Sequence, residues 1–194
     1  MGMTYVLRRA TPEQLALLGR QPQLITRFLF DEPREAAAEA TGLMGQRRDQ
    51  FKFSAPGRPI GGRRVEGDEI DLDKSWHLIH FLLTGSGDCT DDVTSFLVGD
   101  WPEIGDIEVG WGRAWAIDAE AVRRFDDALR DTQDDRLCAR FDTQQMEVED
   151  VYLADAFEGD EPAGCNYVLH HLAVLRSFVA EAARRGCGAV GYLA

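Results

Sequence analysis

The sequence predicts an α+β fold in a single domain that spans residues 1–194. Several helices are expected to pack on a small mixed sheet, with a buried central helix around residues 72–84. Three observations lead to this prediction: short apolar stretches open and close the chain, capped segments with helical spacing lie between them, and one such segment is apolar almost all the way round. A chain of 194 residues can bury one sizeable core, so one domain is the simplest arrangement.

The segment from Asp71 to Gly85 predicts the central helix. Asp71 or Asp73 can cap its start, because a short carboxylate accepts hydrogen bonds from the first turn, and Gly85 can end it. Its apolar residues recur at helical spacing and also fill the flank; they are Leu72, Trp76, Leu78, Ile79, Phe81, Leu82 and Leu83. A helix that is apolar around most of its surface is buried.

The elements before this helix follow from short signals. Residues 5–7 predict an opening strand, and Thr11, Pro12 and Gln14 form the capping-box pattern of a helix start. Pro22 begins a second short helix that carries an apolar face up to Leu29. We therefore expect two short helices in tandem after the first strand.

Glycine and proline interrupt residues 31–67, and only residues 36–40 could hold helical turns. The loop at 42–67 is rich in positive charge, with Arg47, Arg48, Lys52, Arg58, Arg63 and Arg64. It could bind an anion or lie in solvent paired with nearby carboxylates. It contains neither a P-loop nor the glycine pattern of a dinucleotide site.

Less regular signals follow the central helix. Residues 96–98 fit a strand or the end of a helix. Residues 110–117 show an alternating pattern of side chains with flanking glycines, which favours an extended segment. Asp118 is expected to cap the next helix and Thr132 to cap another bearing Leu137 and Phe141. A polar stretch with Asp155, Glu158, Asp160 and Glu161 leads to a last helix at 167–185, and residues 189–193 predict a closing strand.

Composition excludes several classes of protein. No apolar run is long enough to span a bilayer, and the start lacks the features of a secretory signal, so we predict a cytoplasmic protein without membrane contact. Cys89, Cys138, Cys165 and Cys187 are widely separated and show no zinc-site spacing, so reduced thiols are expected. The sequence predicts no bound metal and no cofactor.

The charge balance points to the kind of partner. With 34 acidic and 21 basic residues the net charge is −13, which argues against nucleic-acid binding, because that requires Lys and Arg to neutralise phosphates. The acidity would suit a basic protein partner, or it could serve solubility alone. The oligomeric state stays open.

Six residues are candidates for a cleft or binding site: Asp73, Trp76, His77, His80, Trp111 and Arg113. Three residues apart on one helix, His77 and His80 could approach a common metal or act as acid–base groups. They could equally be buried histidines hydrogen-bonded to the backbone. Tryptophan is usually a core residue, but Trp111 lies between two glycines and is expected to be exposed or to line a cleft.

The segment Leu-Asp-Lys-Ser-Trp-His-Leu-Ile-His-Phe-Leu-Leu-Thr-Gly at 72–85 resembles the DUF1877, or YfbM-like, family. The opening Met1-Gly2-Met3, the Gly110-Trp111-Gly112 turn and Phe141-Asp142 add to the resemblance, which covers nearly the whole chain. The resemblance implies a single α+β domain of unknown function and a link to bacterial toxin–immunity systems. This chain has Trp111 and Arg113 where the resemblance leads us to expect Tyr and Pro.

Two hypotheses of function follow, and neither decides whether the protein is an enzyme. The first is a non-catalytic protein-binding module with a contiguous acidic face, for example an immunity-type partner of a basic toxin. The second is a small-molecule enzyme or sensor with a cleft near Asp73, Trp76, His77 and Trp111, in which a histidine is the acid–base group.

Overall fold

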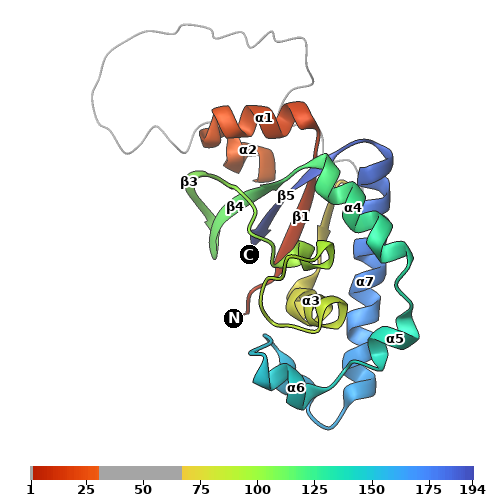
Figure 1. The fold of residues 1–194 in the computed structure, drawn as a ribbon. Helices are drawn as coiled ribbons and strands as arrows, with labels where there is room; N and C mark the ends of the chain where they lie inside the picture. The colour runs from red at the N-terminus through yellow and green to blue at the C-terminus, as the bar shows by residue number, and fades with distance from the viewer. Residues whose placement is uncertain (1, 31–66) are drawn as a thin grey trace, which may run out of the picture.

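The computed structural model describes residues 2–30 and 67–194, and it is organised around a five-stranded sheet (Figure 1). The strands are Tyr5–Ala10 (β1), Glu69–Asp71 (β2), Glu103–Gly110 (β3), Gly112–Ile117 (β4) and Gly188–Leu193 (β5), in the spatial order β2-β1-β5-β4-β3. Helices pack on both faces of this sheet. The predicted α+β fold is confirmed.

The two ends of the chain meet in the middle of the sheet. Tyr5 lies opposite Leu193 and Ala10 opposite Gly188 in the β1–β5 pair. The backbones of Thr4 and Ala194 exchange N–H···O bonds of 3.0 and 2.8 Å just beyond it. The predicted opening and closing strands are therefore confirmed, and they are neighbours.

The described strand pairs are all antiparallel, so the prediction of a mixed sheet is wrong in this detail. Only Trp111 separates β3 from β4, and a connection this short requires antiparallel strands. The sequence did not reveal β2 or β3. Strand β2 has three residues, and β3 mixes glycines with acidic residues, a composition that is unfavourable in strands.

The two tandem helices near the N-terminus are confirmed. Helix α1 (Pro12–Arg20) begins with the predicted capping box: Thr11 Oγ1 accepts from the Gln14 N–H, and the Gln14 side chain accepts from the Thr11 N–H. A 3₁₀ turn, η1 (Pro22–Leu24), leads directly into α2 (Ile25–Phe30). Both helices cover one face of the sheet at its upper end in Figure 1.

Helix α3 (Trp76–Thr84) is the buried central helix that the sequence predicts. Trp76 and the whole run from Leu78 to Leu83 are buried. Gly85 ends the helix with a left-handed φ of +81°, and its N–H donates to Phe81 O at 2.7 Å. The prediction that Asp71 or Asp73 caps this helix is wrong: its N-cap residue is Ser75, which makes no side-chain capping bond. The 3₁₀ turn η2 (Asp73–Ser75) precedes the helix, and Asp71 Oδ1 accepts from the Asp73 N–H at 2.7 Å before this turn.

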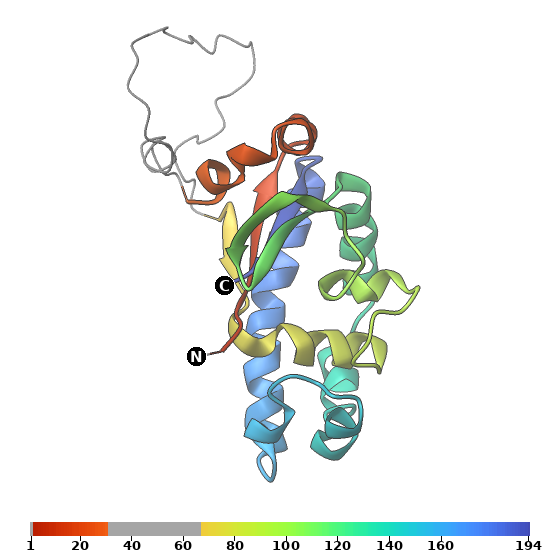
Figure 2. The same ribbon diagram turned by 90° about the vertical axis from the view of Figure 1, so that its left-hand side faces the viewer.

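The remaining elements are η3 (Val93–Leu97), α4 (Ala119–Arg130), α5 (Asp134–Cys138), α6 (Thr143–Val148), η4 (Ala154–Phe157) and α7 (Glu161–Arg184). Asp118 caps α4 as predicted, with Oδ1 accepting from the Ala121 N–H at 2.7 Å. Figure 2 shows α7 running behind the sheet and on past α3 to the lower end of the molecule.

Two helix boundaries differ from the prediction. Helix α5 follows Gln133, and Thr132 instead donates its hydroxyl to Ala128 O at the end of α4, 3.1 Å away. Helix α7 begins at Glu161 rather than at 167, with Asp160 Oδ1 accepting from the Ala163 N–H. Pro162 lies in the first turn of α7, where its missing N–H costs no helical hydrogen bond. Helix α6 was not predicted.

The core has two parts, one on each face of the sheet. Tyr5 and Leu7 of β1 point into the larger part, with α3, α4 and α7. Val6 and Ala10 point into the smaller part, with α1 and α2. This alternation follows from the two-residue period of a strand and explains why the whole of β1 is buried.

The prediction of reduced thiols is wrong for two of the four cysteines. Cys138 and Cys165 form a disulfide with a Cα–Cα distance of 5.6 Å, while Cys89 and Cys187 are free. The pair is separated by 27 residues and carries no spacing signal, so only the packing of α5 on α7 brings it together.

The predicted helical turns at 36–40 and the arginine-rich loop, apart from Gly67, lie outside the described residues. Buried arginines of β1 hold the flanking segments that are described. Arg8 donates to Leu29 O at 2.7 Å, and Arg9 donates to Gly67 O. The hypothesis of an anion-binding loop stays a prediction.

Candidate functional site

Asp73 lies in η2 at the entry to α3 and makes a bond to α7. Its Oδ2 accepts from the Tyr167 hydroxyl at 2.9 Å, and its backbone has a left-handed φ of 49°, which asparagine and aspartate tolerate better than most residues. Burial, followed by the bond to this carboxylate, raises the pKa of Tyr167 to about 12. Asp73 therefore joins the start of α3 to the long helix.

Trp76 lies among aromatic rings. Its indole stacks on His77 with a centroid distance of 4.8 Å and contacts Tyr152 and Tyr5 at 6.1 and 6.0 Å. Only 9% of the residue is exposed, and its indole N–H has no partner among the residues that the structure describes. Trp76 is part of the core.

Both ring nitrogens of His77 bind backbone groups. Nδ1 accepts from the Tyr152 N–H at 2.9 Å, and Nε2 lies 2.7 Å from Gly87 O. Because Nδ1 is an acceptor, the proton must lie on Nε2, which donates to the carbonyl. A general acid or base needs a free nitrogen facing its substrate, and His77 has none in this arrangement.

His80 is completely buried one turn further along α3. Its Nε2 lies 2.9 Å from Asp88 O, and its Nδ1 has no hydrogen-bond partner within the described ranges. Burial is the main cause that lowers the pKa of His80. The two imidazoles do approach one another, at 6.1 Å between centroids, but each is directed to the loop that follows the helix.

Trp111 and Arg113 lie on a different element, the β3–β4 hairpin. Trp111 is 58% exposed, as the flanking glycines predict, and its N–H donates to Leu193 O at 2.8 Å. Arg113 pairs with Glu103 and Asp106 at 2.5 and 3.3 Å across the hairpin. In the described part of the chain, no hydrogen bond or ring contact joins Trp111 to Trp76 or His77.

A shallow cleft of about 220 Å³ lies elsewhere, between η3 and the first turns of α4. Its charged residues are Asp91, Asp92, Asp100 and Arg124, and Trp101 and the free Cys89 also line it. None of the six candidate residues lines this cleft. It also has no histidine, so Cys89 lacks the adjacent base that usually activates a nucleophilic thiol.

Residues 2–30 and 67–194 contain neither a metal-ligand cluster nor a membrane-spanning helix. No group of three or more His, Cys, Asp or Glu side chains in these ranges is placed to hold a metal ion. No helix there is both long and apolar enough to cross a bilayer.

A concentration of acidic residues lies at the lower end of the molecule in Figure 1, in the segment that forms α5, α6 and η4. We call residues 131–161 the acidic end, because this segment holds eleven acidic residues and only two basic ones, Arg136 and Arg140. Nine of the eleven carboxylates are exposed: Asp131, Asp134, Asp135, Asp142, Glu147, Asp150, Asp155, Glu158 and Asp160. The segment thus carries most of the net charge of the whole chain, which is −13.

An apolar side chain lies within this acidic end. Val148, the last residue of α6, is 84% exposed, while Met146 of the same helix is completely buried. The acidic stretch near Asp155 is evident in the sequence, whereas the exposure of Val148 is not, because α6 was not predicted. The buried Met146 marks the inner face of α6, and this is the sequence feature that could have predicted the helix.

Contacts that sequence reasoning missed connect the acidic end to α3. Glu149 Oε2 accepts from the Gly87 N–H at 3.2 Å and the Ser86 hydroxyl at 3.3 Å, next to the bond between Tyr152 and His77. These partners are more than 60 residues apart, so no local pattern could reveal them. The candidate histidine thus helps to position the acidic end.

Comparisons with known proteins agree with this fold. The crystal structure of YfbM, a protein of unknown function from Escherichia coli, superposes with a TM-score of 0.60 and 16% identity over 100% of both chains. At this identity the likeness shows the fold alone. No curated protein matches the chain. The model of the domain of unknown function DUF1877 matches residues 1–192, so the chain belongs to the DUF1877 family.

Proposed function

We propose that this chain is a non-catalytic protein-binding module and that its acidic end binds a basic partner. The observation that carries the proposal is the concentration of eleven acidic residues against two basic ones in residues 131–161. Charge of one sign gathered on one part of a protein steers an oppositely charged partner toward it and disfavours partners of the same charge.

The side chains at this end are available for contact. Asp135, Glu147, Asp150, Asp155 and Glu158 are exposed, and their side-chain carboxylates form no hydrogen bond or ion pair with any described residue. Carboxylates that do not stabilise the fold can pair with Lys and Arg of a partner without loss of internal contacts. They supply the polar rim of a binding surface.

Val148 supplies an apolar contact inside that rim. Binding energy usually comes from a few apolar or aromatic side chains that a charged rim shields from water. At 84% exposure Val148 has nearly its whole surface to bury on binding. The partner is therefore expected to present an apolar recess surrounded by basic residues.

A basic toxin enzyme is one partner of this kind, and the chain would then act as its immunity factor by covering the basic site. The resemblance discussed above led us to expect such a link. The charge at the acidic end supports it, because an enzyme that handles nucleic acid has a basic active site.

The alternative, a small-molecule enzyme or sensor with a cleft near Asp73, Trp76, His77 and Trp111, has less support. His77 would have to release either Gly87 or Tyr152 before it could exchange a proton with a substrate. Trp111 lies on a separate hairpin, and none of these four residues lines the cleft between η3 and α4. That function stays a prediction.

The experiment compares two matched variants with the wild type in affinity capture from a cell lysate, at low and at high salt. The first variant neutralises four unpaired carboxylates of the acidic end: Asp135→Asn, Glu147→Gln, Asp150→Asn and Asp155→Asn. The second changes the same number of exposed carboxylates elsewhere: Asp88→Asn, Asp91→Asn, Asp100→Asn and Glu108→Gln. The net charge of the two variants is equal, so any difference depends on position.

We expect one basic protein to be captured by the wild type and the second variant, and to be lost with the first variant or in high salt. Val148→Asp should weaken capture at all salt concentrations, because it removes the apolar contact. The proposal would be contradicted if the two four-site variants captured the same proteins in the same amounts. It would also be contradicted if no specific protein were captured by any form.

A further inference from the structure

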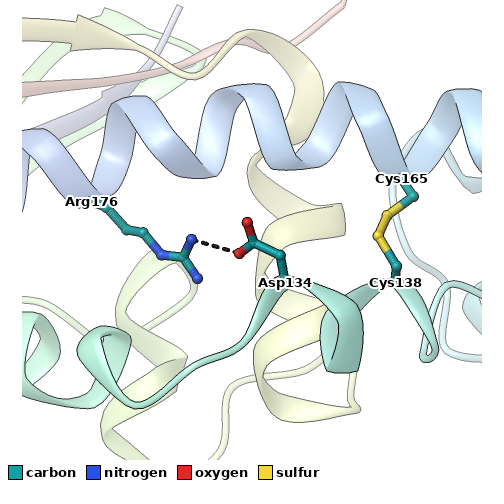
Figure 3. Close-up of a disulfide and its surroundings, with 4 residues drawn as sticks. All are labelled: Asp134, Cys138, Cys165 and Arg176. Carbon is teal, nitrogen blue, oxygen red and sulfur yellow. Dashed lines mark hydrogen bonds and ion pairs between the residues drawn. A yellow bond between two sulfur atoms is a disulfide. The ribbon is translucent and has the colours of Figure 1, made fainter.

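The Cys138–Cys165 disulfide joins α5, which is part of the acidic end, to α7 (Figure 3). Cys165 is 6% exposed and Cys138 is half-buried. We propose that this pair is a reversible redox staple: the disulfide holds the acidic end compact, and its reduction loosens that end. The consequence for partner binding rests on the function proposed above, whereas the structural change does not.

The loop that this bond closes is strongly and uniformly charged. Residues 139–164 contain eight acidic residues and one basic residue, Arg140. The acidic ones are Asp142, Glu147, Glu149, Asp150, Asp155, Glu158, Asp160 and Glu161. Their mutual repulsion favours expansion of the loop. A covalent bond between its ends opposes that expansion directly.

The other contacts at the start of the loop lie near the surface. Arg176 of α7 pairs with Asp134 at 2.6 Å and donates to Thr132 O at 2.9 Å, as Figure 3 shows for the ion pair. Helix α5 has five residues, and its N-cap residue Gln133 makes no side-chain capping bond. A helix this short has little stability of its own and depends on its tertiary attachments. Arg140, just after α5, also donates to Leu82 O and Leu83 O at 3.0 and 3.3 Å. Without the disulfide, the buried Leu137 and these side-chain contacts of Arg176 and Arg140 would have to hold α5.

The middle of the loop has a separate attachment to α3. Glu149 accepts hydrogen bonds from Ser86 and Gly87, and the Tyr152 N–H donates to His77. These bonds do not involve either cysteine. Reduction should therefore loosen two stretches, 139–148 and 153–160, while residues 149–152 stay attached between them.

The geometry allows the pair to open and close again. A Cα–Cα distance of 5.6 Å lies within the range of disulfides, and helix packing brings the two backbones together, so two thiols can remain close after reduction. A low-molecular-weight thiol is the reductant we infer. Its thiolate attacks Cys138 Sγ, which belongs to the less buried residue of the pair, and Cys165 leaves as a thiolate.

A second thiol molecule completes the exchange. Its thiolate attacks the sulfur of the first, which leaves Cys138 as a thiolate and forms the disulfide of the small thiol. Both protein thiolates then take up the two protons that the small thiols lost. The protein gains two electrons, the two small thiols lose them, and re-oxidation by the small disulfide is the reverse sequence.

The test uses the full chain with Cys89→Ser and Cys187→Ser, which removes the free thiols and prevents wrong pairing. This protein is equilibrated in buffers with different ratios of reduced to oxidised glutathione, and its mass reports the redox state. Hydrogen exchange is then compared between the oxidised and reduced forms. A second protein with Cys138→Ser and Cys165→Ser on the same background serves as the control that cannot close the bond.

We expect exchange in 139–148 and 153–160 to rise on the order of tenfold on reduction, with little change in 149–152 and in the second half of α7. The control should resemble the reduced form in every buffer. The proposal is overturned if exchange is the same in the two redox states, or if the pair stays reduced in every glutathione buffer. Redox-dependent exchange without any partner capture would count against the proposed function alone.

Discussion

The backbone N–H of Tyr152 donates to Nδ1 of His77 across 2.9 Å, and this bond joins residues that are 75 positions apart. It leaves Nε2 as the protonated nitrogen, which donates to Gly87 O. One imidazole thus holds together α3, the loop after it and the chain between α6 and η4. In this structure a residue that looks catalytic in the sequence connects three segments.

His77→Ala should therefore destabilise the fold. It removes two hydrogen bonds and leaves the Tyr152 N–H and the Gly87 carbonyl without their partner, so we expect the free energy of unfolding to fall by about 2–4 kcal/mol. Urea unfolding followed by circular dichroism measures the change. The control is His170→Ala, an exposed histidine on α7, where a change within about 0.5 kcal/mol is expected. Equal effects at the two positions would contradict the structural role of His77.

His80 should make the stability depend on pH. Burial holds the pKa of His80 below its ordinary value, so the unfolded chain binds a proton more readily than the folded protein does. The free energy of unfolding should then fall as the pH drops below the unfolded pKa of about 6.5, and this loss should end below the folded pKa.

The measurement for His80 is the urea midpoint between pH 7.5 and pH 5. His80→Gln can still donate to Asp88 O but cannot be protonated in this range, so the variant should show a smaller pH dependence than the wild type. His171, whose pKa burial also lowers, contributes in the same direction and is present in both proteins. Parallel pH profiles would rule out the assigned role of His80.

The bond between Tyr167 and Asp73 can be tested in two ways. Tyr167→Phe removes a half-buried hydrogen bond to a carboxylate and should cost about 1 kcal/mol of stability, and a double-mutant cycle with Asp73→Ala, which removes the acceptor, should show that most of this loss is shared. Asp73→Asn should also lower the pKa of Tyr167 from about 12, because it removes the negative charge beside the phenol. Burial is the larger cause and persists, so the decrease should be partial. Ultraviolet titration of the phenol measures it, and an unchanged pKa would refute the contact.

Two glycines with open surroundings should respond in opposite ways to the same substitution. Gly85→Ala places a side chain at a φ of +81° and should cost about 1 kcal/mol, although an added Cβ would meet no neighbour within 4 Å. Gly19→Ala lies inside α1, also without neighbours, and should stabilise by about 0.5–1 kcal/mol through helix propensity. Thermal unfolding of both variants gives the comparison, and a shared sign would show that φ does not decide the outcome.

Features that depend on residues within one or two helical turns of each other were predicted correctly from the sequence. The capping box at Thr11, the cap at Asp118, the stop at Gly85 and the burial of α3 all depend on neighbours a few residues away. Predictions failed where local composition was ambiguous. Strand β3 contains Gly105, whose φ of +66° and close packing on Pro22 depend on tertiary contacts.

In the candidate site, too, one local feature was predicted and the long-range contacts were not. The exposure of Trp111 was predicted from its two glycines, but no pattern in the sequence could show that both nitrogens of His77 are taken by backbone groups from other segments. The six candidate residues therefore fall on two separate elements, α3 with its entry turn and the β3–β4 hairpin.

The sequence by itself determined which segments are helical or extended at the two ends of the chain, that one helix must be buried, and that the protein is strongly acidic. Only the tertiary structure decided that the strands are antiparallel, that Cys138 meets Cys165, and that His77 binds the backbones of Tyr152 and Gly87. The physical reason is range: helix caps and apolar periodicity act over a few residues, whereas these contacts depend on which surfaces remain to be covered once the helices and strands have formed.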